Sequence, residues 1–131
     1  MATSNATPVL ELVPLLFVKE IGRSVAFDQQ LGFALAREWS PEGKLMWCRM
    51  KRGGVAVMLQ QACEEDGPAA GRGHGIIFYF NCADVDAIHN EFAASGLHLP
   101  APKTAVYGEK QVHFRDPDEY ELCFQSTVKS S

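Results

Sequence analysis

The apolar residues of the first half of the chain fall into short runs separated by turn-forming residues. Residues 9–18 are almost continuously apolar, which is typical of a strand covered on both faces, although Pro14 favours an edge or irregular strand. Helical periodicity follows over residues 21–31 and ends at Gly32, which suits a left-handed helix end. Further strands are predicted over residues 33–39, 45–50 and 55–60. The first half therefore predicts the order strand, helix, strand, strand, strand.

The second half repeats this order after a polar, glycine-rich break at residues 63–73. The pattern predicts a strand over residues 75–80 and a helix over 83–95 that ends at Gly96. Strands are then expected over residues 97–99, 111–115 and 120–125, with a loop at 100–109.

The two halves can be superimposed as an internal repeat. Val57 and Leu59 lie 65 residues before Leu122 and Phe124, and Gly32 and Gly96 close the two helices. The predicted fold class is α+β, with modules 9–62 and 74–126 inside one domain, 9–131, and a flexible tail at residues 1–8. One such module cannot bury both faces of its sheet, so we expect modules to pair within a chain or between chains.

Composition narrows the classes of function. The chain has 131 residues, 47% of them hydrophobic and 21% charged, as expected for a single globular domain. The absence of a Lys/Arg cluster argues against nucleic acid, and no apolar stretch approaches the ~20 residues of a membrane helix. The N-terminus lacks the pattern of a secretory signal. Four cysteines without a CxxC pair favour free thiols in a cytoplasmic protein.

Three stretches carry a resemblance to a known family. They are residues 18–27 with Leu31-Gly32-Phe33, residues 81–87, and Phe114-Arg115-Asp116-Pro117-Asp118. In this order they resemble the vicinal oxygen chelate superfamily, which includes glyoxalase I, extradiol dioxygenases and bleomycin resistance proteins. The resemblance implies two βαβββ modules that form a cleft from curved mixed sheets, in an intertwined homodimer.

Enzymes of this family hold a divalent metal at four strand positions. The resemblance places these positions at Val13, Met58, Ile77 and Cys123, and the spacings from 13 to 77 and from 58 to 123 are 64 and 65 residues. Val and Ile offer no ligand atom, and Met and Cys favour soft ions. We therefore expect no metal and no cofactor, and a protein that sequesters a small molecule without changing it, as bleomycin resistance proteins do.

Alternation along the strands predicts which side chains face the cleft. Cys123 would bring Gln125 to the cleft, and Met58 would bring Gln60. Ile77 would bring Tyr79, Val13 would bring Phe17, and Tyr107 could cover the cleft from its loop. The predicted ligand-binding residues are Phe17, Met46, Cys48, Met58, Gln60, Tyr79, Tyr107, His113 and Cys123. Trp47 has the opposite parity to Cys48, but the register there is uncertain. Such an apolar, aromatic site with a few polar groups suits a small aromatic or amphipathic molecule.

Two alternatives remain open from the sequence. A metal-dependent lyase or dioxygenase could use other ligands, such as His74, His113 and Glu121, if these converge. A non-catalytic interaction module would instead fill the cleft with its own side chains. Asp116-Pro117-Asp118 favours a hairpin turn over a catalytic carboxylate pair.

Overall fold

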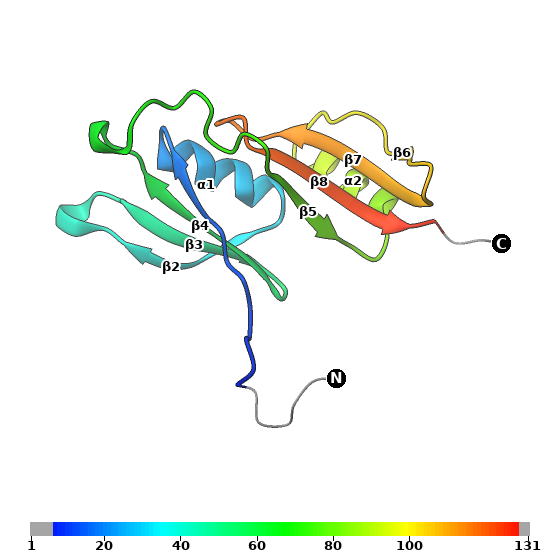
Figure 1. The fold of residues 1–131 in the computed structure, drawn as a ribbon, viewed down its shortest axis with the longest axis horizontal. Coiled ribbons are helices and arrows are strands. Elements are labelled where there is room, and N and C mark those ends of the chain that lie inside the picture. Colours follow the sequence, from blue (N-terminus) through cyan, green and yellow to red (C-terminus); the bar gives the residue numbers. More distant parts are fainter. Residues whose placement is uncertain (1–6, 129–131) are drawn as a thin grey trace.

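The computed structural model describes residues 7–128, so most of the predicted tail, residues 1–6, lies outside the described part. Each half of the chain forms a strand, a helix and three further strands (Figure 1). The elements of the first half are β1 (Leu15–Val18), α1 (Ile21–Gln30), β2 (Ala34–Trp39), β3 (Trp47–Arg52) and β4 (Val55–Gln61). Those of the second half are β5 (Ile77–Asn81), α2 (Val85–Ala94), β6 (Lys103–Thr104), β7 (Glu109–Arg115) and β8 (Glu121–Thr127). The predicted α+β fold of two modules is confirmed.

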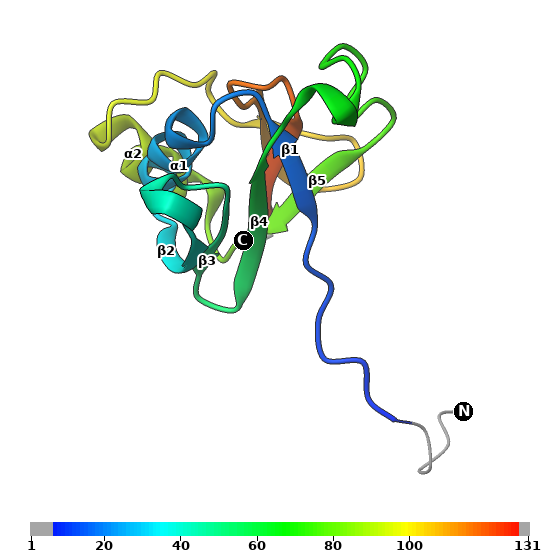
Figure 2. The ribbon, with the colours of Figure 1, turned by 90° about the vertical axis from the view of Figure 1, so that its left-hand side faces the viewer.

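The strands form two mixed four-stranded sheets with equivalent topology. Their orders are β1-β4-β3-β2 and β5-β8-β7-β6. In each sheet the first and last strands of the module pair in parallel, and the remaining pairs are antiparallel. Both helices lie on one side of the two sheets, as the side view shows (Figure 2). Within residues 7–128, the opposite faces of the sheets carry no helix, and we call these the open faces.

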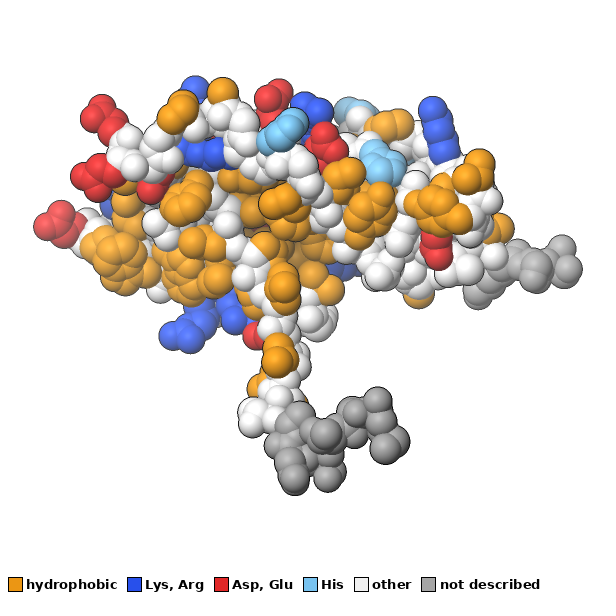
Figure 3. Space-filling view, viewed as in Figure 1, with side chains coloured by type: hydrophobic (Ala, Val, Ile, Leu, Met, Phe, Trp, Pro, Cys, Tyr) orange, Lys and Arg blue, Asp and Glu red, His pale blue; other side chains and the backbone are white. Residues whose placement is uncertain are grey.

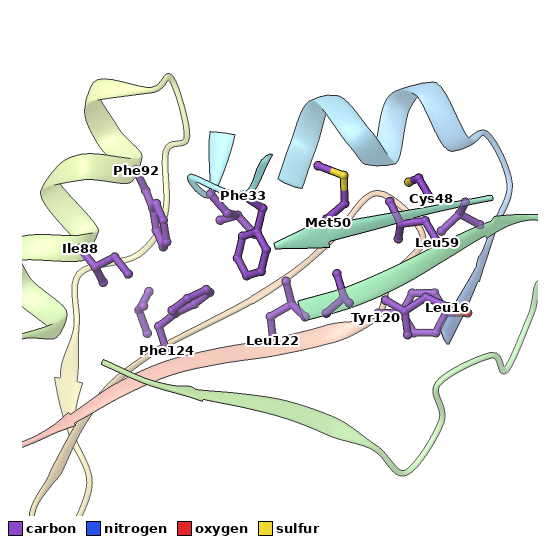
Figure 4. Close-up of a cluster of buried hydrophobic side chains, with 14 of the residues drawn as sticks. Leu16, Phe33, Cys48, Met50, Leu59, Ile88, Phe92, Tyr120, Leu122 and Phe124 are labelled. Carbon is purple, nitrogen blue, oxygen red and sulfur yellow. The ribbon is translucent and has the colours of Figure 1, made fainter. Parts of the chain in front are cut away.

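A single hydrophobic core lies between the helices and the sheets and spans both modules (Figure 4). Phe92 of α2 packs edge to face on Phe124 of β8, with ring centroids 5.0 Å apart. Phe33 of the first module contacts Phe80 of the second at 6.0 Å. Tyr120, Leu122 and Phe124 point toward the helix layer, as strand alternation predicts.

The turn between β7 and β8 connects the modules. Asp116 accepts hydrogen bonds at Oδ1 from the backbone N–H groups of Asp118 and Tyr120, both at 2.9 Å. This confirms its predicted role in a turn. The Asp118 carboxylate accepts from the Lys19 backbone at 2.7 Å and from Ser24 Oγ at 3.1 Å. The Tyr120 hydroxyl donates to the Phe17 carbonyl at 2.7 Å. These bonds hold the second hairpin against the end of β1 and the start of α1.

Two predicted strands differ from those in the structure. The first begins only at Leu15, because Pro14 has no N–H for a sheet ladder, although its carbonyl accepts from Met58 at 2.8 Å. Residues 97–99 are not a strand. Leu97 instead donates its N–H to Phe92 at 2.9 Å and caps α2, and the short strand β6 follows later.

Within residues 7–128, neither helix has the length and apolar character needed to cross a membrane.

Candidate functional site

The open face of the first sheet is built from alternate residues of its four strands. Leu16, Cys48, Met50 and Leu59 are buried in the core, so their neighbours along each strand point the other way. Strand register aligns these neighbours in two rows across the sheet. The first row holds Trp39, Trp47, Gln60 and Phe17, and the second holds Arg37, Arg49, Met58 and Leu15.

Predicted residues Phe17, Met58 and Gln60 therefore share this open face. Met46 lies just before β3 and lines a hollow of about 390 Å³ together with Trp39, Trp47 and Gln60. In the space-filling view, hydrophobic side chains gather over the strands of this sheet (Figure 3).

The prediction that Cys48 faces the cleft is wrong. Its exposed fraction is 0%, and it lies in the core on the helix side. The two hairpins explain the error. Arg49 pairs with Met58, nine positions on, whereas His113 pairs with Cys123, ten positions on. The β3–β4 hairpin is therefore one residue shorter than the β7–β8 hairpin. Matching Cys48 to His113 by the repeat was thus one residue out, and a shift of one residue exchanges the two faces of a strand.

The open face of the second sheet carries a network of amide and hydroxyl groups. Gln125 Nε2 donates to Asn81 Oδ1 at 2.9 Å, and Gln111 Nε2 donates to Gln125 Oε1 at 2.9 Å. Gln111 also contacts the Tyr107 hydroxyl and, at 3.2 Å, the Nε2 atom of His113. Tyr107 and His113 thus lie in one network with the three amides Asn81, Gln111 and Gln125.

Cys123 lies on this open face but is covered by its neighbours. It pairs with Tyr79 on one side and His113 on the other. These rings belong to strands about 9.5 Å apart, yet their centroids are only 6.2 Å apart, so they lean together across β8. Burial raises the pKa of the Cys123 thiol to about 11. The thiol is therefore protonated at neutral pH and is neither a good nucleophile nor a good metal ligand.

The residues at the family's metal positions do not fit a divalent ion that prefers oxygen or imidazole ligands. Met58 and Cys123 lie on the open faces, Ile77 is in β5, and Val13 precedes β1. Among residues 7–128, no three His, Cys, Asp or Glu side chains gather closely enough to hold a metal. His74, His113 and Glu121 are thus not brought together, and Glu121 instead pairs with Arg115 at 3.0 Å.

Sequence reasoning missed Trp39 and Asn81, which the structure places at the site. Trp39 lines the hollow of the first open face, and Asn81 accepts a hydrogen bond from Gln125 on the second. Trp39 was missed because its contribution depends on its pairing with Trp47, and an irregularity between Leu35 and Arg37 shifts that register. The parity of Trp47 was the available signal.

Comparisons with known proteins give the same fold. Residues 10–124 match the profile of the Glyoxalase/Bleomycin resistance protein/Dioxygenase superfamily. A comparison with curated proteins finds no match.

Solved structures resemble the whole chain at low sequence identity. A glyoxalase/bleomycin resistance protein/dioxygenase from Nocardioides has a TM-score of 0.70 and 14% identity, covering 98% of this chain and 89% of its own. A bleomycin-binding protein in complex with bleomycin has a TM-score of 0.67 and 14% identity, covering 92% and 98%. A bleomycin resistance determinant encoded on the transposon Tn5 has a TM-score of 0.66 and 14% identity, covering 92% and 98%. The fold and the family match together show that this chain belongs to the glyoxalase/bleomycin resistance protein/dioxygenase superfamily.

Proposed function

We propose that this protein binds a small aromatic or amphipathic molecule without a metal and sequesters it unchanged. The observation that carries the proposal is the chemistry of the open faces. They combine apolar and aromatic side chains with a few orienting amides, the usual make-up of a small-molecule site. Two structural neighbours are a bleomycin-binding protein and a bleomycin resistance determinant, which supports binding as the kind of activity.

The proposed binding cleft needs a second copy of the chain. The two open faces of one chain lie side by side and turn the same way, so neither covers the other (Figures 1 and 3). We propose a homodimer in which the first open face of one copy faces the second open face of the other. Two equivalent clefts then form per dimer.

The segment before β1 supports this dimer. Val9, Leu10 and Leu12 have exposed fractions of 92%, 89% and 87%, and the segment projects away from the body of the chain (Figure 2). The Glu11 carboxylate accepts from Arg49 at 2.8 Å, which holds the base of the segment against the first open face. Three large apolar side chains in an extended segment favour burial against another copy.

The chemistry of the site favours binding over catalysis. The thiol that occupies one family metal position is buried and protonated, and the other three positions hold Val, Met and Ile. The four cysteines are free thiols, which supports a reducing, cytoplasmic location as part of the proposal.

Metal content and catalysis test this proposal together. Untagged protein is analysed for bound metals, and its activity is measured on the glutathione adduct of methylglyoxal. We expect less than one divalent ion per ten chains, on the order of background, and no turnover. A stoichiometric divalent ion, or turnover that a chelator abolishes, would instead identify a metal-dependent lyase of the superfamily.

A further inference from the structure

The two tryptophans of the chain form one surface. Trp39 of β2 and Trp47 of β3 are direct partners in the antiparallel ladder and share the first open face. Trp39 has an exposed fraction of 58%, which is high for the largest apolar side chain. The hollow of about 390 Å³ lies beside this pair, which we call the tryptophan platform. It offers flat apolar area at which an aromatic ring can stack.

A row of cations runs beside the tryptophan platform. Arg37 and Arg49 are also direct ladder partners, two residues further along the same strands. Lys51 follows on the same face of β3. Among residues 7–128, Glu11 is the one carboxylate paired with this row, through Arg49 at 2.8 Å, and Arg37 and Lys51 have no salt-bridge partner. Three cations thus face one anion on the surface of a chain whose net charge is −4.

The second open face does not cancel this positive charge. Its central groups are neutral amides and hydroxyls, among them Gln111, Gln125 and Tyr107. Its charged side chains balance, because Arg115 is paired with Glu121 at 3.0 Å, and Lys103 and Glu109 add one charge of each sign to the same face. The cationic row of the first sheet therefore sets the sign of the field in a cleft built from both faces.

The distance between the tryptophan platform and the cationic row indicates the size of a ligand that contacts both. Two residues along a strand span about 6.6 Å, so the arginine pair lies about one ring system away from the tryptophan pair. A flat aromatic body on the platform would place an anionic group at this distance within reach of Arg37. Guanidinium groups bind carboxylates and similar planar anions with two parallel hydrogen bonds.

We infer that the cleft selects planar aromatic anions over neutral or cationic molecules of the same shape. This inference rests on the proposed function and adds the charge of the ligand to it. The platform supplies stacking for any aromatic ring, and the cationic row supplies the discrimination.

Tryptophan fluorescence can test the inference directly, because both tryptophans lie in the platform. The full chain is titrated with three probes of one shape: naphthoate, naphthylmethanol and naphthylmethylammonium. We expect naphthoate to bind about three- to tenfold more tightly than naphthylmethanol, and the ammonium probe to bind most weakly. The preference for naphthoate should shrink in about 1 M sodium chloride, where the screening length is about 3 Å.

Single substitutions test the selection of anions separately from the stacking of the aromatic ring. Arg37→Gln should remove most of the preference for naphthoate over naphthylmethanol, while Arg37→Lys should keep part of it. Lys19→Gln is the matched control, since it removes an equal charge from an exposed residue outside the open face. Trp39→Ala should weaken all three probes by a similar factor.

Two outcomes overturn the inference in distinguishable ways. Equal binding of naphthoate and naphthylmethanol, or a preference that Arg37→Gln leaves intact, contradicts the selection of anions while the binding function stands. Failure of all three probes to bind a chain with a normal circular dichroism spectrum contradicts the proposed function as well.

Discussion

The Asp28 side chain is buried on the inner side of α1, and its Oδ2 atom has no hydrogen-bond partner among residues 7–128. Burial, and secondly the charge of Asp116, raise the pKa of Asp28 to about 7. Burial also raises the pKa of Asp116 to about 6, against hydrogen bonds from Tyr120 and Asp118. From β3, the Cys48 thiol faces Asp28 with a pKa raised to about 11, mainly by burial. The seam between the modules therefore favours a neutral Asp28.

These shifts predict how stability changes with pH. The folded chain holds the Asp28 proton more tightly than the unfolded chain, whose pKa is near the ordinary value of 3.8. The folded state therefore loses stability as the pH rises from about 4 through about 7. Asp116 acts in the same direction over a lower range.

Asp28→Asn should stabilise the protein at high pH, because the amide keeps the shape of the side chain without a charge. We expect a higher melting temperature than the wild type at about pH 8.5 and a much smaller difference at about pH 4. Thermal unfolding followed by circular dichroism measures both. Glu65→Gln, in an exposed turn, is the control. A variant that is equally or less stable than the wild type at high pH would show that the buried Asp28 carboxylate does not destabilise the fold.

At the same scale, the sequence predicted residues on β4 and β8 better than those on β3. The alternation of Leu59, Met58, Leu122 and Cys123 identified the inner and outer faces of these two strands. The face of Cys48 depends on the length of a turn elsewhere in the hairpin, which apolar periodicity does not contain.

The elements themselves follow closely from the apolar pattern. Both helices and six of the eight predicted strands appear within a few residues of their expected bounds. Gly32 and Gly96 adopt φ values of 83° and 99°, as left-handed helix ends require. The two exceptions are residues 9–14 and 97–99, which are apolar but do not form strands. One segment projects from the body, and the other caps α2.

The segment between the modules contains a glycine that packs against the second hairpin. Gly73 has a φ of 75°, and a Cβ atom there would lie 2.5 Å from the ring of Tyr120. Tyr120 in turn joins the modules through its bond to Phe17. This close approach packs the connecting segment against the second hairpin at Gly73.

Gly73→Ala should therefore destabilise the fold more than the same change at a nearby glycine. Gly71 is the matched control, since its φ is 86° and a Cβ atom there would meet nothing within 4 Å. We expect Gly73→Ala to cost about 1–3 kcal/mol more than Gly71→Ala, because both add backbone strain but only one displaces Tyr120. Urea unfolding of both variants measures the difference. Equal free energies of unfolding would show that Tyr120 moves aside freely.

At the scale of the whole molecule, one core holds both modules together while both open faces remain uncovered. Phe33 against Phe80 and the bonds of Asp118 link the modules on the helix side. The repeat in the sequence predicted that modules must pair, but it left open whether they pair within or between chains. Within one chain they share the helix-side core, and the open faces remain uncovered. The proposed dimer is therefore the step that turns two flat faces into clefts.

Native mass spectrometry of the full chain, with and without naphthoate, tests the central claim most directly. It reports the number of chains, the bound ligand and any bound metal in one experiment. We predict a mass of two chains without a divalent ion, and two naphthoate molecules added per dimer at saturation. A single chain that binds no naphthoate, or a dimer that carries one divalent ion per chain, would contradict it.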